Sequence, residues 1–181
     1  MKIGVLALQG AFIEHINMLK ALGAAPVEIR QKADLAPDFS GLVLPGGEST
    51  VMSLLLHKLG LFEPLRTAII GGLPTFGTCA GLILLAQHFN VLDVAVNRHG
   101  FGRQINSFSE YGDFAGLGQT PMVFIRGPYI TEVGDDVKIL ARAKDKIVAV
   151  QQNNILGVAF HPELTDDSKV HEYFLKKTID K

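Results

Sequence analysis

Short apolar runs alternate with amphipathic segments through the first half of the chain. The runs at residues 2–8 and 41–45 are aliphatic and end next to glycine or glutamine-glycine turns, which is typical of strands buried on both faces. Between them, Phe12, Ile16 and Leu19 recur at the spacing of one helical face. The alternation continues with a strand at 27–30, helices at 48–59, 61–70 and 80–88, and a strand at 74–76. This order predicts a parallel sheet covered by helices on both faces.

Strand-like runs separated by turn residues fill the second half. The turn signals are GDD, KDK and NN, and short turns of this kind favour antiparallel hairpins. The runs are residues 122–126, 137–143, 146–152 and 155–160, and an amphipathic helix at about 168–179 follows them. We therefore expect an α/β fold with three layers (αβα), in which a mostly parallel central sheet gains antiparallel strands in the C-terminal half. No repeat or linker is visible, so residues 1–181 are expected to form one domain.

Composition narrows the function classes. Of the 181 residues, 48% are hydrophobic and 19% charged, and the formal net charge is −1, which argues against disorder and gives no basic surface for nucleic acid. A single cysteine cannot form an internal disulfide, and no Cys/His spacing suggests a metal site. No segment is apolar for long enough to span a membrane, and no cleavage site follows the first apolar run. We expect a cytoplasmic protein without metal or cofactor.

The single cysteine lies in Gly77-Thr78-Cys79-Ala80-Gly81, between a predicted strand and a predicted helix. This is the G-x-nucleophile-x-G pattern of a nucleophile elbow, in which a sharp strand-to-helix turn exposes the nucleophile. The start of a helix also favours a thiolate over a thiol. The alternative, a buried core cysteine, is ordinarily more common, but the flanking glycines favour the elbow.

A cysteine nucleophile needs a base and usually a group that orients the base. Among the six histidines, His161 ends a predicted strand and is followed by Pro162 and Glu163. In extended backbone, residues two positions apart point the same way, so we expect the Glu163 carboxylate to lie beside the ring of His161, with Pro162 fixing the backbone between them. The alternative is that Pro162 only terminates a strand. His99, in a glycine-rich loop, stays open, and the histidines in predicted helices are expected to be surface or satisfied core residues: His15, His57, His88 and His171.

A third strand-to-helix junction carries Gly46-Gly47, followed by Glu48-Ser49-Thr50. Backbone N–H groups at such a glycine pair, together with the N–H of Ala80, can bind a developing oxyanion. A plain turn with Ser49 or Thr50 as helix cap is the alternative. Functional groups gather at the carboxyl ends of parallel strands, and all three junctions are predicted to lie there.

These segments resemble the class I, or triad, glutamine amidotransferases, whose glutaminase domains carry a G-x-C-x-G elbow, an upstream PGG loop and a late HPE. A narrower resemblance is to the glutaminase subunits of two-subunit pyridoxal 5′-phosphate synthases. The stretches that carry it are IGVLALQGAFIEH, LPGGESTVM, FGTCAGLILLA, FGRQINSF, Ile125-Arg126 before GP, and AFHPELTDD. They cover nearly the whole chain in order, and their combination is more specific than the triad alone.

The resemblance implies a flavodoxin-like glutaminase in which Cys79 attacks the side-chain amide of L-glutamine, His161 carries the proton and Glu163 orients His161. Glutamate and ammonia are the implied products, with no cofactor. Its glutamine-binding positions fall on Gly47, Glu48, Ser49, Arg98, Ile125 and Arg126, and its oxyanion region on Gly46, Gly47 and Ala80. The implied partner is a (β/α)8-barrel synthase subunit, in a hetero-oligomer, that joins the ammonia to a pentose phosphate and a triose phosphate.

Two segments depart from the family pattern. The family usually reads R-N-[SA]-[FY]-G-R-Q in the substrate loop, whereas residues 98–104 read RHGFGRQ, and the connection over residues 87–98 is shorter than usual. Gln9-Gly10 is expected near the oxyanion loop, in a place to couple docking to activation. A glutaminase that serves the histidine, purine or tryptophan pathway stays an alternative, as does a non-catalytic regulatory subunit of the same fold.

Overall fold

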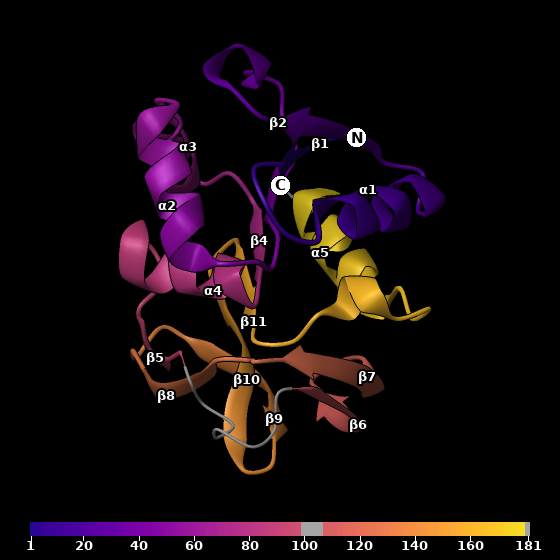
Figure 1. Cartoon of the computed structure of the whole chain (residues 1–181). Helices are drawn as coiled ribbons and strands as arrows, with labels where there is room; N and C mark the ends of the chain where they lie inside the picture. The colour runs from indigo at the N-terminus through magenta and orange to yellow at the C-terminus, as the bar shows by residue number, and fades with distance from the viewer. Residues whose placement is uncertain (99–106, 180–181) are drawn as a thin grey trace.

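A computed structural model of the chain describes residues 1–98 and 107–179 (Figure 1). The strands are β1 (Lys2–Leu6), β2 (Ala25–Ile29), β3 (Gly41–Leu44), β4 (Thr75–Thr78), β5 (Val94–Asn97), β6 (Ser107–Phe114), β7 (Gly118–Ile125), β8 (Tyr129–Val133), β9 (Lys138–Ala143), β10 (Lys146–Gln152) and β11 (Ile155–Val158). The helices are α1 (Phe12–Ala21), α2 (Ser49–Lys58), α3 (Phe62–Ile70), α4 (Ala80–Ile83) and α5 (Lys169–Ile179). Short turns complete the elements: η1 (Lys32–Asp34), the π-helical η2 (Leu84–His88) and η3 (Pro162–Leu164).

In the described residues the strands form one mixed sheet in the order β2-β1-β3-β4-β11-β10-β9-β6-β7. The first five strands of this order are parallel to their neighbours. From β10 onward the pairs are antiparallel, and β8 pairs with both β10 and β5. The predicted α/β class, with a mostly parallel core and antiparallel strands from the C-terminal half, is confirmed.

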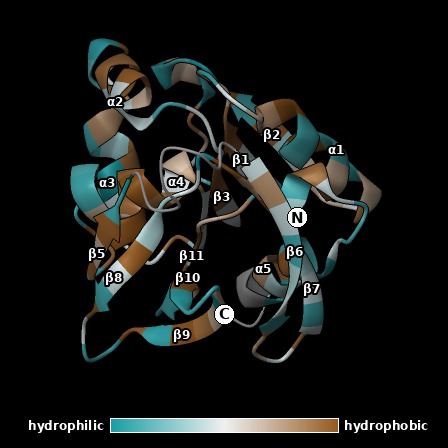
Figure 2. Cartoon of the chain, turned by 60° about the horizontal axis from the view of Figure 1, so that its bottom comes forward, coloured by the Kyte–Doolittle hydropathy of each residue, from teal (hydrophilic) through white to brown (hydrophobic). Residues whose placement is uncertain are grey.

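Helices cover both faces of the parallel part (Figure 1). Helices α1 and α5 lie on one face, and α2, α3 and α4 lie on the other. The inward faces of these helices are apolar: Ile16 and Leu19 of α1 and Leu65 and Ile69 of α3 are buried. Figure 2 shows the same division on α3, which is hydrophilic outside and hydrophobic toward the sheet. Among the described residues, no helix has the length and apolarity needed to cross a membrane.

Three strands were not predicted from the sequence: β5, β6 and β8. Strand β6 reads SFSEYGDF and is half exposed along most of its length, so it lacks the buried apolar run that marks a central strand. It is held as a hairpin with β7, in register from Ser107 opposite Ile125 to Phe114 opposite Gly118. Strand pairing of this kind depends on backbone bonds to a partner and leaves a weak pattern in the strand itself.

Candidate active site

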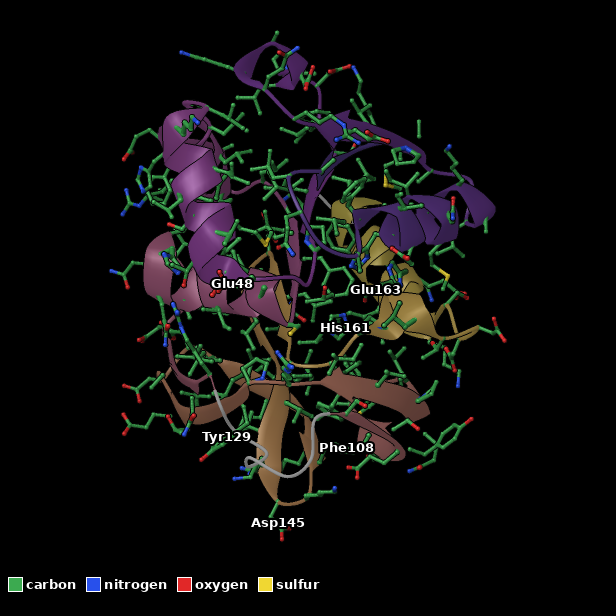
Figure 3. All side chains as sticks on the ribbon, in the orientation of Figure 1. Glu48, Phe108, Tyr129, Asp145, His161 and Glu163 are labelled. Carbon is green, nitrogen blue, oxygen red and sulfur yellow. The ribbon has the colours of Figure 1, made fainter. Side chains whose placement is uncertain are left out.

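The ends of four parallel strands bring most of the predicted site residues together, and Arg98, Ile125 and Arg126 come from the ends of β5 and β7. Strands β1, β3, β4 and β11 are neighbours and run the same way, so the segments that follow them meet at one edge of the sheet. A cleft of about 550 Å³ opens there. The predicted residues that line it are Gly47, Glu48, Ser49, Cys79, Arg98, Ile125, Arg126 and His161. Glu163 lies behind His161, fully buried, and Figure 3 shows both near the centre of the molecule, below α1 and α5.

Cys79 lies in a tight turn between β4 and α4. Its backbone has φ +49°, a value that non-glycine residues rarely adopt. Both flanking glycines are required by close backbone contacts: a Cβ on Gly77 would lie 2.7 Å from the carbonyl carbon of Gly81, and a Cβ on Gly81 would lie 2.0 Å from Leu44 O. Cys79 is only 7% exposed, but it lines the cleft, so its thiol faces the space that a substrate can enter.

His161 is anchored by its backbone N–H, which donates to Val123 O on β7 at 2.8 Å. Its Nδ1 lies 2.7 Å from Glu163 Oε1. The route between the two differs from the prediction, because the chain turns into the short helix η3 after His161 and does not continue as extended backbone. The 3₁₀ turn brings the carboxylate back beneath the ring, so the contact forms by a different backbone path.

His161 and Glu163 shift each other's pKa values. Burial by itself would lower the pKa of His161, but hydrogen bonds to Cys79 and Glu163 and the negative charges beside it raise the pKa to about 10. Burial would raise the pKa of Glu163, yet its interactions with His15 and His161 hold that pKa below its usual value. His161 is therefore protonated at neutral pH, with a carboxylate on one side and the cysteine sulfur on the other. A protonated imidazole beside sulfur suits a thiolate nucleophile.

The glycine loop after β3 packs tightly around the site. A Cβ on Gly46 would lie 2.2 Å from His161 Cε1, so only glycine fits against the ring. The carbonyl of Gly46 accepts a bond from the Ala11 N–H at 3.1 Å, and Gln9 Oε1 accepts from the Glu48 N–H at 2.7 Å. The turn after β1 thus fastens the glycine loop. Gly47 lines the cleft, and Ala80 follows Cys79 as the first residue of α4.

The cap of α2 is Glu48, which corrects the alternative that named Ser49 or Thr50. The Glu48 carboxylate accepts from the N–H groups of Thr50 and Val51 at 3.0 and 2.9 Å. These backbone bonds hold the pKa of Glu48 below its usual value. The carboxylate therefore caps the helix, and Glu48 also lines the cleft.

Arg98 is held by three side chains at the rim of the cleft. Its Nε donates to Gln87 Oε1 at 2.8 Å, its Nη1 donates to Thr50 Oγ1 at 3.3 Å, and its Nη2 lies 3.0 Å from His88 Nε2. Gln87 also donates to Val96 O at 2.9 Å, so the short connection over residues 87–98 is braced from within. The predicted FGRQ motif and His99 lie outside the described residues.

Two buried histidines were not predicted as site residues. His15 and His171 are fully buried, in contact with each other, and His15 also lies 3.4 Å from Glu163 Oε2. The sequence carried a signal for His15, because it falls on the same helical face as Ile16 and Leu19. No comparable pattern marks its meeting with His171. Among residues 1–98 and 107–179, no group of three His, Cys, Asp or Glu side chains could hold a metal.

Comparison with known proteins decides the family. The model of the SNO glutamine amidotransferase family matches residues 5–180. The chain belongs to this family. It is 50% identical over 192 residues to a protein from Streptococcus pneumoniae (strain CGSP14), covering 100% of this chain and 99% of that protein. It is 53% identical over 183 residues to one from Methanocorpusculum labreanum, covering 97% of each. Both relatives are named pyridoxal 5′-phosphate synthase subunit PdxT.

A solved structure supports the same family. A crystal structure of a glutamine amidotransferase superposes with a TM-score of 0.91 at 42% identity. The superposition covers 97% of this chain and 98% of that one. The chain therefore shares the fold of that glutamine amidotransferase over nearly its whole length.

Proposed function

We propose that this chain is the glutaminase subunit of a pyridoxal 5′-phosphate synthase, which hydrolyses L-glutamine to L-glutamate and supplies the ammonia to a synthase subunit. The observation that carries the proposal is the line of Cys79, His161 and Glu163 at one edge of the sheet, in a cleft lined by the family's glutamine-binding positions. Family membership and the names of relatives at 50% identity and above agree with it.

The geometry supports a two-step hydrolysis. In the first step, the Cys79 thiolate attacks the amide carbon of glutamine, and protonated His161 gives its proton to the departing nitrogen, which leaves as ammonia. A glutamyl thioester remains on Cys79. In the second step, neutral His161 takes a proton from water, the resulting hydroxide attacks the thioester, and glutamate leaves as the thiolate is restored. Glu163 keeps the imidazole oriented through both steps.

Negative charge develops on the former amide oxygen in both steps. N–H groups of Gly46-Gly47 and of Ala80 are our candidates to bind it, because Ala80 directly follows Cys79 and Gly47 lines the same cleft as Cys79. The contact between Gly46 and the His161 ring places the glycine loop against the triad. The fastening of that loop by Gln9 links it to the surface turn after β1.

Arg98 is our candidate for binding the α-carboxylate of glutamine. Three of its five guanidinium N–H groups are used by Gln87, Thr50 and His88, and within the described part of the chain two remain for an anion. A guanidinium fork held in place suits a carboxylate. The other proposed contacts also line the cleft: Ile125 and Arg126, and Gly47, Glu48 and Ser49 of the glycine loop.

A partner subunit follows from the chemistry of the product. Ammonia that escapes into water is protonated and lost as a nucleophile, so a glutaminase of this type needs an acceptor subunit docked over its cleft. We infer a synthase subunit in a hetero-oligomer, since the relatives are named as subunits of pyridoxal 5′-phosphate synthase, and the (β/α)8 barrel of that subunit is what the family resemblance implies. A reducing, cytoplasmic setting fits the single free cysteine at the site.

The decisive experiment measures glutamate formation with and without a pyridoxal 5′-phosphate synthase subunit, while the absorbance of the cofactor is followed in the same tube. We expect glutamate to form faster when the subunit is present, and pyridoxal 5′-phosphate to accumulate. Glutamate without cofactor formation would assign the ammonia to another acceptor. No glutamate under either condition would make the chain a non-catalytic subunit.

A further inference from the structure

Two imidazoles lie on the side of Glu163 that faces away from His161. His15, on α1, has its Nε2 at 3.4 Å from Glu163 Oε2 and at 3.1 Å from Thr78 Oγ1. Its Nδ1 lies 2.9 Å from Nε2 of His171, on α5. Because Glu163 Oε1 contacts His161 Nδ1, the carboxylate lies between two imidazole rings, one at each oxygen. In Figure 3, Glu163 lies next to α1 and α5.

The surroundings of these rings are apolar. The ring of Phe76 meets His15 and His171 edge to face, with centroids 5.9 and 5.4 Å away. Burial lowers the pKa of His15, although the nearby Glu163 acts in the opposite direction, and burial holds the pKa of His171 well below its usual value. The charged or titratable groups that act on His15 are Glu163, His161, His171 and Glu14. Both His15 and His171 are therefore neutral at physiological pH, so each carries a single N–H.

Only one placement of these two protons suits the contacts. If His15 carried its proton on Nδ1, its bare Nε2 would face the Glu163 carboxylate, and His171 would be left with a buried N–H that lacks an acceptor. With the proton on His15 Nε2, that N–H donates to Thr78 Oγ1 at 3.1 Å and lies 3.4 Å from the charged Glu163 Oε2, and His15 Nδ1 accepts from His171 Nε2. Two buried polar atoms then lack a regular hydrogen bond among the described residues: the bare Nδ1 of His171, and Glu163 Oε2, which the His15 N–H approaches at 3.4 Å.

We propose that His15 is a positioning residue of the active site, whose Nε2–H holds the outer oxygen of Glu163 and thereby keeps the inner oxygen on His161 Nδ1. The proposal rests on the proposed function, because it assigns His15 to the same triad. Glu163 Oε2 is fully buried and forms no regular hydrogen bond among the described residues, and it lies 3.4 Å from His15 Nε2. Without His15 this oxygen would be stranded in an apolar space, so the carboxylate would turn or take up a proton and release its hold on His161.

The test compares three variants. His15→Leu removes the donor and keeps a side chain of similar bulk. His15→Gln restores an N–H donor near the position of Nε2. Ile16→Ala is the matched control, since Ile16 is the buried neighbour of His15 on α1 and its truncation weakens the same helix without removing a polar group. For each protein, kcat and KM for glutamine are measured per folded molecule with the synthase subunit, and ¹⁵N NMR follows the histidine tautomers and the titration of His161.

We expect His15→Leu to lower kcat by about tenfold to a hundredfold, the usual loss when the outer partner of a functional side chain is removed, and to change KM by no more than about twofold. The titration of His161 should move to lower pH in the same variant. His15→Gln should recover most of the wild-type kcat and of the wild-type titration of His161. Ile16→Ala should keep both at their wild-type values. In the wild-type protein, NMR should place the His15 proton on Nε2.

Two results would overturn the proposal: a wild-type His15 protonated on Nδ1, or a His15→Leu variant whose His161 titrates as in the wild type. Both readouts are independent of turnover, and the first needs no variant to fold. A wild-type chain that forms no glutamate with the synthase subunit would instead count against the proposed function, and the NMR result would still decide the place of His15.

Discussion

At the scale of single residues, three neighbouring side chains hold the guanidinium of Arg98 in a fixed orientation before any substrate binds. The interaction with His88 requires a bare imidazole Nε2. Burial and the charge of Arg98 lower the pKa of His88 and keep that nitrogen bare at neutral pH. The guanidinium therefore keeps its orientation at a low entropic cost when a carboxylate binds.

Arg98→Lys should raise KM for glutamine by about tenfold to a hundredfold, because an ammonium group cannot form the paired bonds of a guanidinium. The value of kcat should change far less, since Arg98 is placed to touch the α-carboxylate and not the reacting amide. Steady-state kinetics with the synthase subunit measures both. Arg66→Lys is the control, because Arg66 donates to Phe89 O on another part of the surface. An unchanged KM in Arg98→Lys would remove Arg98 from the glutamine site.

Residue types and their places in the chain were enough to predict Cys79, His161 and Glu163 as neighbours. The local reason for the contact between His161 and Glu163 was wrong, because the chain forms a 3₁₀ turn there and not an extended strand. His15 was expected to be an ordinary helical histidine. Its role as a neighbour of Glu163 depends on the packing of α1 against the turn after β11, and one helical face cannot reveal what lies opposite it.

At the scale of elements, the elbow is a tight packing of β4, α4 and β3. The segment over residues 80–88 was predicted as one helix, but it begins as α4 and ends in the π-helical turn η2, which delivers Gln87 and His88 to Arg98. Helical periodicity in LILLA cannot distinguish an α-helix from a wider turn. Strand β6 escaped prediction for a related reason, since its pairing partner and not its own pattern stabilises it.

Gly81→Ala should destabilise the protein and remove glutaminase activity. The added Cβ would lie 2.0 Å from Leu44 O, a backbone atom that cannot move without shifting β3 or the elbow. We expect a loss of about 1–3 kcal/mol in the free energy of unfolding, the range for overpacked sites, measured by urea denaturation. Gly71→Ala is the control, because it ends α3 with φ −69° and its nearest contact would be 3.2 Å. Equal stability and activity of the two variants would contradict the account of the elbow.

At the scale of the whole molecule, the order of strands in the sheet determines which segments meet at the active site. The sequence indicated parallel strands whose carboxyl ends carry the glycine loop, the cysteine and the histidine, and the sheet does place β3, β4 and β11 side by side. The meeting of His15 with His171, 156 positions apart, lay beyond such reasoning because α1 and α5 are brought together only by the finished fold.

The two buried neutral histidines lead to a prediction of how the stability of the whole chain depends on pH. His15 and His171 have lowered pKa values when folded but titrate near 6.5 when unfolded, so the unfolded state binds more protons below that pH. The free energy of unfolding should therefore fall as pH drops from about 6.5 to 5, by at most about 1.4 kcal/mol per pH unit for each histidine. Urea titrations at several pH values measure this slope, which should be shallower in His171→Leu.

His161 acts in a different pH window. Its pKa of about 10 in the folded protein means that its contribution to stability is complete below about 6.5 and is lost as pH rises toward 10. Glu163, whose pKa is lowered, contributes to stability at pH values above its unfolded pKa of 4.5 and loses that contribution only at lower pH.

A free energy of unfolding that stays constant between pH 6.5 and 5 would contradict the assignment of His15 and His171 as neutral buried groups.

The most direct test of the central claim, that Cys79 is the nucleophile of a glutaminase site, is the rate of glutamate formation by Cys79→Ala with the synthase subunit present. Alanine is small and keeps the packing of the turn, so the variant should fold like the wild type. We predict that glutamate formation falls to the level measured without enzyme, while the thermal unfolding curve stays close to that of the wild type. Glutamate formation retained by a folded Cys79→Ala variant would contradict the account.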